Sequence, residues 1–140
     1  MIGIFAAVMG TTLPFLGSFR ETETLETEVQ SMVHTLRRAQ SRAANGRRDT
    51  SWGVQITSDT YVMFAGNSYA SRNTALDETQ ELTLAYTSTG SGEVVFTYQE
   101  GTPVKPATFV LYNPSAGTGT ITVNGGGGIS YDLLRITNQP

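Results

Sequence analysis

The sequence predicts an α+β protein: a long N-terminal helix packed on an antiparallel β-sheet or a small β-sandwich head. Three observations lead to this prediction. Residues 1–19 carry no charge, residues 20–46 repeat apolar side chains with a helical period, and from residue 50 onward the period changes to two. With 140 residues, the chain is long enough for one globular domain and a short appendage.

Residues 1–19 are predicted to form a hydrophobic stem or membrane-anchor helix. A helix of this length spans about 28 Å, close to the ~30 Å hydrocarbon core of a bilayer. Three glycines and Pro14 make the segment a marginal membrane span when taken alone. It is also a poor secretory signal peptide, because no basic residues precede the apolar run and no clear cleavage site ends it. A buried core segment of a soluble domain is the alternative interpretation.

Residues 20–46 are predicted to form an amphipathic helix. Ser18 and Glu21 have the spacing of a capping box, which indicates a helix start. Asn45-Gly46 predicts the end, because both residues tolerate the left-handed backbone of a helix C-terminus. One apolar stripe runs between these points and is expected to pack on the sheet. Its residues are Leu25, Val29, Met32, Val33, Leu36, Ala39 and Ala43.

Residues 47–140 are predicted to form a β-rich head of seven strands, which joins the amphipathic helix in one domain, residues 20–140. Two apolar runs, 52–56 and 61–64, flank a short polar turn and predict a tight hairpin. Residues 66–80 are polar and irregular, which predicts a loop. Five further strands are expected between turns rich in Gly, Pro and Ser. They are Glu81–Thr87, Glu93–Gln99, Thr108–Tyr112, Thr120–Asn124 and Ile129–Ile136.

The composition excludes several classes of functional site. The chain contains no cysteine, which excludes disulfides, thiolate metal sites and cysteine nucleophiles. The single histidine, His34, excludes a site with several histidine ligands, and its place opposite the apolar stripe predicts a solvent-facing or subunit-facing side chain. The net charge of −3 argues against a general nucleic-acid binder. No catalytic residue, metal or cofactor is predicted.

Two loops invite functional interpretations. The run Gly125–Gly128 lacks the Lys and Ser/Thr of a phosphate-binding loop and precedes a predicted strand, so it predicts a turn. The carboxylates of residues 66–81 are scattered and do not follow the calcium-loop pattern. Calcium binding in that loop stays open as an alternative.

The charges of the predicted helix are distributed unevenly along it. Acidic residues occupy its first part, and basic residues occupy its end and the following turn, Arg47-Arg48. This order complements the helix dipole, which is one sufficient explanation. The other is that staggered parallel copies pair their acidic and basic segments, whose centres lie about 25 Å apart along a helix. The residues proposed for such pairing are Glu21, Glu23, Glu26, Glu28, Arg37, Arg38 and Arg42.

The order of these segments resembles a type IV pilin-like subunit, and most closely the H-type minor pseudopilins of type II secretion. The resemblance rests on the stem with its proline (Ile2–Pro14), the amphipathic helix and its end (Val29–Arg48) and the first hairpin (Trp52–Phe64). The segments Thr120–Asn124 and Gly128-Ile129 resemble the family's last strands. The resemblance implies a head of two sheets, although a single sheet against the helix fits the pattern as well.

The sequence departs from the family pattern near its first residues. Family members begin with a short basic leader that ends in Gly, and they carry Glu as the fifth mature residue. Here the first carboxylate is Glu21. If Pro14 corresponds to the family's stem proline, the family sequence extends further upstream than Met1. Leader processing and N-methylation are therefore assigned to no residue of this chain.

The resemblance implies a structural subunit of a type IV pilus-like filament or a type II secretion pseudopilus, which polymerises through its N-terminal helix. It implies insertion in the bacterial inner membrane before assembly, and then an extracellular or periplasm-spanning filament. The implied partners are further copies or other pilin-like subunits and the inner-membrane assembly machinery. The stem residues expected to pack in the filament core are Ile2, Ile4, Phe5, Val8, Leu13, Pro14, Phe15 and Leu16.

A minor pilin that binds a ligand or DNA at a filament tip is the alternative function. DNA is not the expected partner, because Arg47-Arg48 is the only compact basic pair outside the helix and residues 111–140 contain only Arg135. A membrane-anchored β-domain that forms no polymer is a further alternative. Nothing in the sequence points to an enzyme.

Overall fold

The computed structural model describes residues 25–57, 59–88, 92–114 and 116–135. This part of the chain contains one long helix, residues 25–44, and eight strands. Two short 3₁₀ turns, η1 (Arg47–Asp49) and η2 (Thr74–Leu76), lie in the connections. The strands are β1 (Trp52–Ile56), β2 (Thr60–Ala65), β3 (Glu78–Glu81), β4 (Ala85–Ser88), β5 (Glu93–Phe96), β6 (Ala107–Asn113), β7 (Gly117–Val123) and β8 (Ile129–Arg135).

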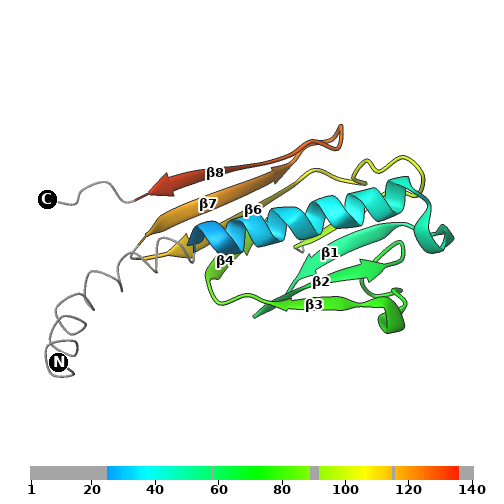
Figure 1. Cartoon of the computed structure of the whole chain (residues 1–140), viewed down its shortest axis with the longest axis horizontal. Helices are drawn as coiled ribbons and strands as arrows, with labels where there is room; N and C mark the ends of the chain where they lie inside the picture. The colour runs from blue at the N-terminus through cyan, green and yellow to red at the C-terminus, as the bar shows by residue number, and fades with distance from the viewer. Residues whose placement is uncertain (1–24, 58, 89–91, 115, 136–140) are drawn as a thin grey trace, which may run out of the picture.

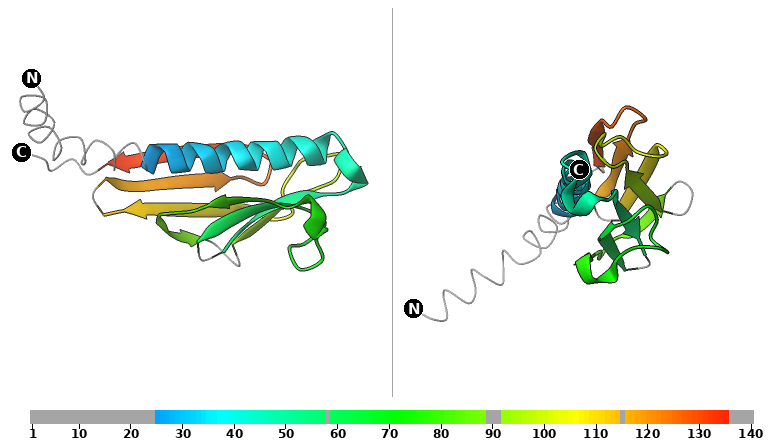
Figure 2. Two further views of the ribbon diagram at one scale, coloured as in Figure 1. Left: turned by 60° about the horizontal axis from the view of Figure 1, so that its bottom comes forward. Right: turned by 90° about the vertical axis from the view of Figure 1, so that its right-hand side faces the viewer.

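The strands form two antiparallel sheets of four strands each. The first sheet has the order β3-β2-β1-β5 and the second has the order β4-β6-β7-β8. The chain crosses from the first sheet to the second between β3 and β4, returns for β5 and crosses again before β6. The helix lies lengthwise against both sheets (Figure 1), and the end-on view in Figure 2 shows it at one side of the pair. The fold is therefore α+β, as predicted, and the head has two sheets.

The helix ends where the sequence predicts. Gly46 adopts a left-handed backbone with φ of 66°, and its N–H donates to the carbonyl of Ala43 at 3.1 Å. The same carbonyl also accepts from the N–H of Gln99 at 2.8 Å, so the head supplies a second hydrogen bond to the helix end.

The core lies where the helix meets both sheets. The apolar helix stripe packs with Trp52 and Met63 of the first sheet and with Phe109 and Ile121 of the second, all 2% exposed or less. Close contact with the second sheet depends on Gly119 of β7. A Cβ atom at this position would overlap the Val29 Cγ2 methyl, so only glycine lets the helix approach this closely.

The face of the first sheet that points away from the helix is covered by the loop after β2. Val62 and Phe64 are buried, although they alternate with the β2 side chains that face the main core. Tyr69, from the loop after β2, packs edge-on against Phe64 with ring centroids 5.6 Å apart. The loop between β2 and β3 is thus anchored to the head.

The predicted strand boundaries are wrong between residues 78 and 99. Residues 78–80 were expected in a loop, yet Glu78–Glu81 forms β3 at the edge of the first sheet. Its side chains are all polar and largely exposed, so no apolar alternation marks it. The expected strand Glu81–Thr87 is divided, because the chain changes sheets after Leu82. Eight strands therefore replace the expected seven.

The strand expected at Glu93–Gln99 is also shorter than predicted. β5 ends at Phe96, and Gln99 adopts a left-handed backbone with φ of 70° in the turn toward the second sheet. The first hairpin and the last three strands are confirmed, with β6 and β7 longer than expected. The tetraglycine run is a turn between β7 and β8, closed by a bond from the N–H of Asn124 to the carbonyl of Gly128 at 2.9 Å.

Candidate functional site

The candidate site comprises the helix and the side chains grouped around its C-terminal end. The seven stripe residues that the sequence assigned to sheet packing are buried, each 2% exposed or less. The residues assigned to a filament core lie outside the described residues, as do Glu21 and Glu23. The structure therefore places the head-facing side of the helix and leaves the stem as a prediction.

The solvent side of the helix carries polar contacts to β8. Glu26 Oε2 accepts from the Arg135 guanidinium at 3.0 Å, and Arg37 donates to the carbonyl of Ile129 at 3.2 Å. Both contacts are exposed, and an exposed ion pair contributes about 1 kcal/mol or less. His34 is exposed on the same side, as its position opposite the stripe predicts. These contacts tie β8 to the outer side of the helix, which stays exposed around His34.

Arg38 and Arg42 have a partner within the subunit, which sequence reasoning missed. Glu78 at the start of β3 accepts from Arg38 Nη2 at 2.7 Å and pairs with Arg42 Nη1 at 2.6 Å. The Arg42 guanidinium also lies 5.0 Å from the centroid of the Trp52 ring, in cation–π range. Reversing these two charges would disturb the head as well as any contact between subunits. Pairing of Arg38 and Arg42 with another copy stays a prediction, and the structure provides a competing intramolecular partner.

The two arginines also control the ionisation of Glu78. Burial alone would raise the pKa of Glu78, but the hydrogen bonds and charges of Arg38 and Arg42 together outweigh burial, and the pKa is lowered. Because the pKa of Glu78 is lowered in the folded state, its ionised carboxylate stabilises the fold at pH values above the ordinary pKa of the group. That contribution is lost as the pH falls through the folded-state pKa.

Replacing Glu78 with Gln is therefore expected to have a pH-dependent effect on stability. The variant should melt at a lower temperature than the wild type near neutral pH. The difference should shrink as the pH falls below the ordinary carboxyl value of 4.5. Melting curves from about pH 7 to about pH 3 check this. Glu100→Gln, an exposed substitution, serves as the control, and a Glu78→Gln deficit that persists unchanged at the lowest pH would contradict the assignment.

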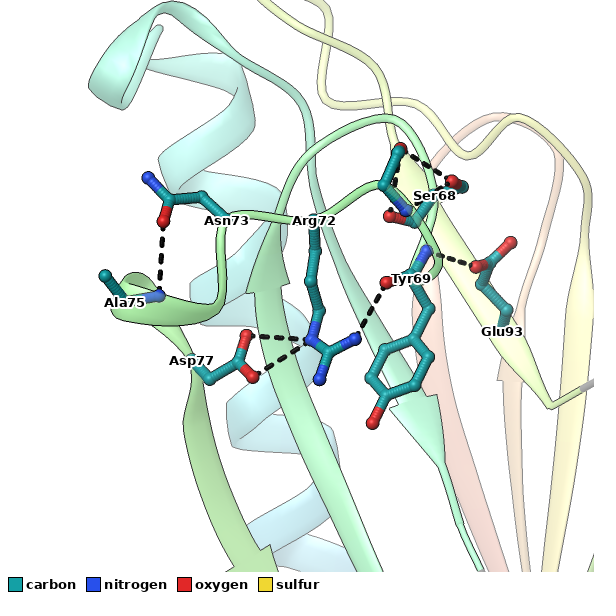
Figure 3. Close-up of polar contacts among 8 residues, drawn as sticks. Ser68, Tyr69, Arg72, Asn73, Ala75, Asp77 and Glu93 are labelled. Carbon is teal, nitrogen blue, oxygen red and sulfur yellow. Dashed lines mark hydrogen bonds and ion pairs between the residues drawn. The ribbon is translucent and has the colours of Figure 1, made fainter.

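The loop between β2 and β3 is organised around Arg72, as Figure 3 shows. Arg72 Nε donates to both carboxylate oxygens of Asp77, at 3.1 and 2.9 Å, and Arg72 Nη1 donates to the carbonyl of Tyr69 at 2.9 Å. The guanidinium lies 3.8 Å from the centroid of the Tyr69 ring. The backbone N–H of Tyr69 in turn donates to Glu93 on β5 at 2.7 Å. These contacts fix one wall of the region beyond the helix end.

The calcium alternative concerned this same loop. Arginines bind two of its carboxylates, Asp77 and Glu78. Within the described residues, no group of three or more His, Asp or Glu side chains is placed to hold a metal ion. Asp77 and Glu78 therefore have structural partners in this fold.

An open pocket of about 270 Å³ lies between the helix end, η1 and the β2–β3 loop. Its lining includes Arg42, Arg47, Arg48 and Trp52 on one side and Asp77 and Glu78 on the other. The sequence indicated the basic character of the helix end. It gave no sign that residues 75–78 would complete the pocket, because those contacts join segments far apart in the chain.

The described part of the chain thus places one long helix lengthwise against two antiparallel sheets. The solved structure of the minor pseudopilin EpsH from the type 2 secretion system of Vibrio cholerae has this fold. It is similar to this chain with a TM-score of 0.59 and 13% sequence identity, over 78% of this chain and 96% of that chain. The predicted resemblance to pilin-like proteins is thus confirmed for the fold. No family model and no curated protein matches the sequence.

The membrane anchor predicted for residues 1–19 lies outside the described residues. Among the residues that the structure describes, none of the helices has both the length and the apolar character needed to cross a bilayer.

Proposed function

We propose that this chain is a structural subunit of a type II secretion pseudopilus or a related type IV pilus-like filament, and that it polymerises through its N-terminal helix. The observation that carries the proposal is the pilin-like arrangement of the head, in which the helix is buried along one face only. The uncharged residues 1–19 lie five residues upstream of the described helix, where a stem that packs in a filament core would stand.

The proposal gives each segment a separate task. Residues 1–19 form the stem, which sits in the inner membrane before assembly and packs against other stems afterwards. Gly3, Gly10 and Gly17 would let neighbouring stem helices approach closely. Residues 20–140 form one folding unit, and its outer surface meets solvent and the neighbouring subunits. The partners are further copies or other pilin-like subunits and the inner-membrane assembly machinery. No catalytic role is proposed.

Deleting residues 1–19 tests this division of tasks. The remaining chain is expected to stay folded and monomeric, because the stripe that holds the helix to the head begins at Leu25. Its incorporation into filaments should fall to background, because the apolar contacts between stems are lost. Gel filtration and melting curves check the fold, and filament fractions from cells that express the shortened chain check assembly.

A second variant separates filament assembly from membrane anchoring. In this variant an unrelated apolar helix of equal length replaces residues 1–19. If the protein is only a membrane-anchored β-domain, the variant and the wild type should both be found in the membrane fraction and in no filament. If it is a filament subunit, the wild type should enter filaments, whereas the variant should remain in the membrane fraction. Filaments that still contain the stemless chain would refute the proposal.

A further inference from the structure

The end of the head around the helix C-terminus concentrates positive charge, although the chain as a whole carries −3. Five of the nine cationic side chains line the pocket there or pair with a residue that lines it. They are Arg38, Arg42, Arg47, Arg48 and Arg72. Most of the remaining cations lie elsewhere on the described surface, such as Lys105 in the connection before β6 and Arg135 at the end of β8.

Three of these arginines neutralise the two acidic side chains that line the pocket. Glu78 is bound by Arg38 and Arg42, and Asp77 is bound by Arg72. The guanidinium groups of Arg47 and Arg48 are exposed, and neither has a partner within the described part of the chain. A carboxylate that reaches the pocket from outside would therefore meet two free arginines, while the neighbouring Asp49 carboxylate accepts a hydrogen bond from the Tyr98 hydroxyl.

The backbone that carries the two free arginines is held in an unusual conformation. Arg48 and Asp49 both adopt left-handed backbone angles, with φ of 59° and 53°, directly after the left-handed Gly46. Such angles are unfavourable for residues with a Cβ atom and persist only where the surroundings enforce them.

Several contacts fix this turn. The indole N–H of Trp52 donates to the carbonyl of Arg47 at 2.9 Å, and the Tyr98 hydroxyl donates to Asp49 Oδ1 at 3.2 Å. The N–H of Asp49 donates to the carbonyl of Gly46 at 2.9 Å. Trp52 is almost fully buried, so the turn is tied to the core. The fold thus presents two unpaired guanidinium groups on a backbone that is already ordered, which lowers the entropic cost of binding.

We infer that the Arg47-Arg48 turn binds the acidic segment of a second copy of this chain, residues 21–28. This inference rests on the proposed function and names one contact between subunits. The segment carries four carboxylates, at Glu21, Glu23, Glu26 and Glu28, and no basic residue. Glu26 binds Arg135 and Glu28 binds Thr83 within the same chain, so the contact is assigned to Glu21 and Glu23. In staggered parallel subunits, a shift of about 35 Å along the helix axis brings this segment of one copy beside the turn of the next. Two free arginines on a net-acidic chain suit a short acidic peptide better than a nucleic-acid backbone, which calls for a broad basic surface.

A charge exchange tests the inference in the full-length chain. Arg47→Glu combined with Arg48→Glu should lower the fraction of the chain found in filaments about tenfold, because two exposed ion pairs are lost and replaced by repulsion. Glu21→Arg combined with Glu23→Arg should lower it similarly, and the two pairs of substitutions together should restore assembly. Lys105→Glu reverses an exposed cation elsewhere and should leave assembly unchanged. An unaltered melting temperature in each variant excludes misfolding as the cause.

Cross-linking gives a second, independent measurement. The chain contains no cysteine, so one copy with Arg48→Cys and another with Glu23→Cys should give a covalent dimer with a short thiol-reactive cross-linker. Asp132→Cys paired with Glu23→Cys is the control and should give none. If the wild-type chain is found in filaments but the charge exchange fails to restore assembly, this contact is overturned and the filament proposal stands. The same holds if the cysteine variants give no covalent dimer. Absence of the wild-type chain from all filaments would overturn both. DNA retention that depends on Arg47 and Arg48, with assembly unaffected by their reversal, would likewise overturn the contact.

Discussion

Replacing Gly119 with alanine is expected to destabilise the folded head by at least about 3 kcal/mol, the upper end of the usual cost of overpacking. The added Cβ would overlap the Val29 Cγ2 methyl and lie 3.2 Å from Leu133 Cδ2. Val29 cannot move aside easily, because a β-branched side chain in a helix has one strongly preferred rotamer. The helix would have to lift from the second sheet and open the core. Denaturant unfolding of the full-length chain in detergent, followed by circular dichroism, measures the loss.

Gly125→Ala is the matched control for this prediction. The same substitution there places a Cβ atom in open space within the β7–β8 turn, with no neighbour within 4 Å. Its stability should stay close to that of the wild type. If Gly119→Ala were as stable as Gly125→Ala, the close approach of helix and sheet would be contradicted.

Replacing Trp52 with alanine is expected to cost about 3–5 kcal/mol, the range for truncating a large buried aromatic side chain. Trp52 is 2% exposed and belongs to the core cluster beneath the helix. Its ring also supports the Arg42 guanidinium, and its indole N–H holds the carbonyl of Arg47. The variant should therefore lose both stability and the ordered turn beyond the helix. Circular dichroism is the required probe, because Trp52 is the only tryptophan in the chain.

Trp52→Phe separates the two roles of this side chain. Phenylalanine keeps most of the apolar volume but cannot donate to Arg47, so the loss should be about 1 kcal/mol, the value of one hydrogen bond. A Trp52→Ala variant that unfolds at the same denaturant concentration as Trp52→Phe would show that the ring does not anchor the helix end.

The parts of the fold that could be predicted are those whose signal is local. The helix stripe repeats every three or four residues, and Gly46 marks the helix end by its backbone freedom. The first hairpin and the β6–β8 meander join neighbouring segments by short turns. β3 escaped prediction because an exposed edge strand of sequence Glu-Thr-Gln-Glu buries nothing and shows no alternation.

The candidate site was predictable only in its composition. Basic residues at the end of the helix are visible in the sequence, but their division into paired and free arginines is a tertiary property. Glu78 lies 40 residues beyond Arg38 and reaches it only because β3 pairs at the edge of the first sheet. The left-handed backbone of Arg48 and Asp49 was equally hidden, because neither residue type requires it and only the contacts of Trp52 and Tyr98 enforce it.

The most direct test of the filament proposal is to image filaments sheared from the cells that produce this chain and to identify their subunits by mass spectrometry. We expect thin filaments that contain the chain, and antibody labelling along their length or at their ends would distinguish a main subunit from a minor one. Filaments that lack the chain entirely, with all of it recovered from the membrane fraction as monomer, would contradict the filament proposal.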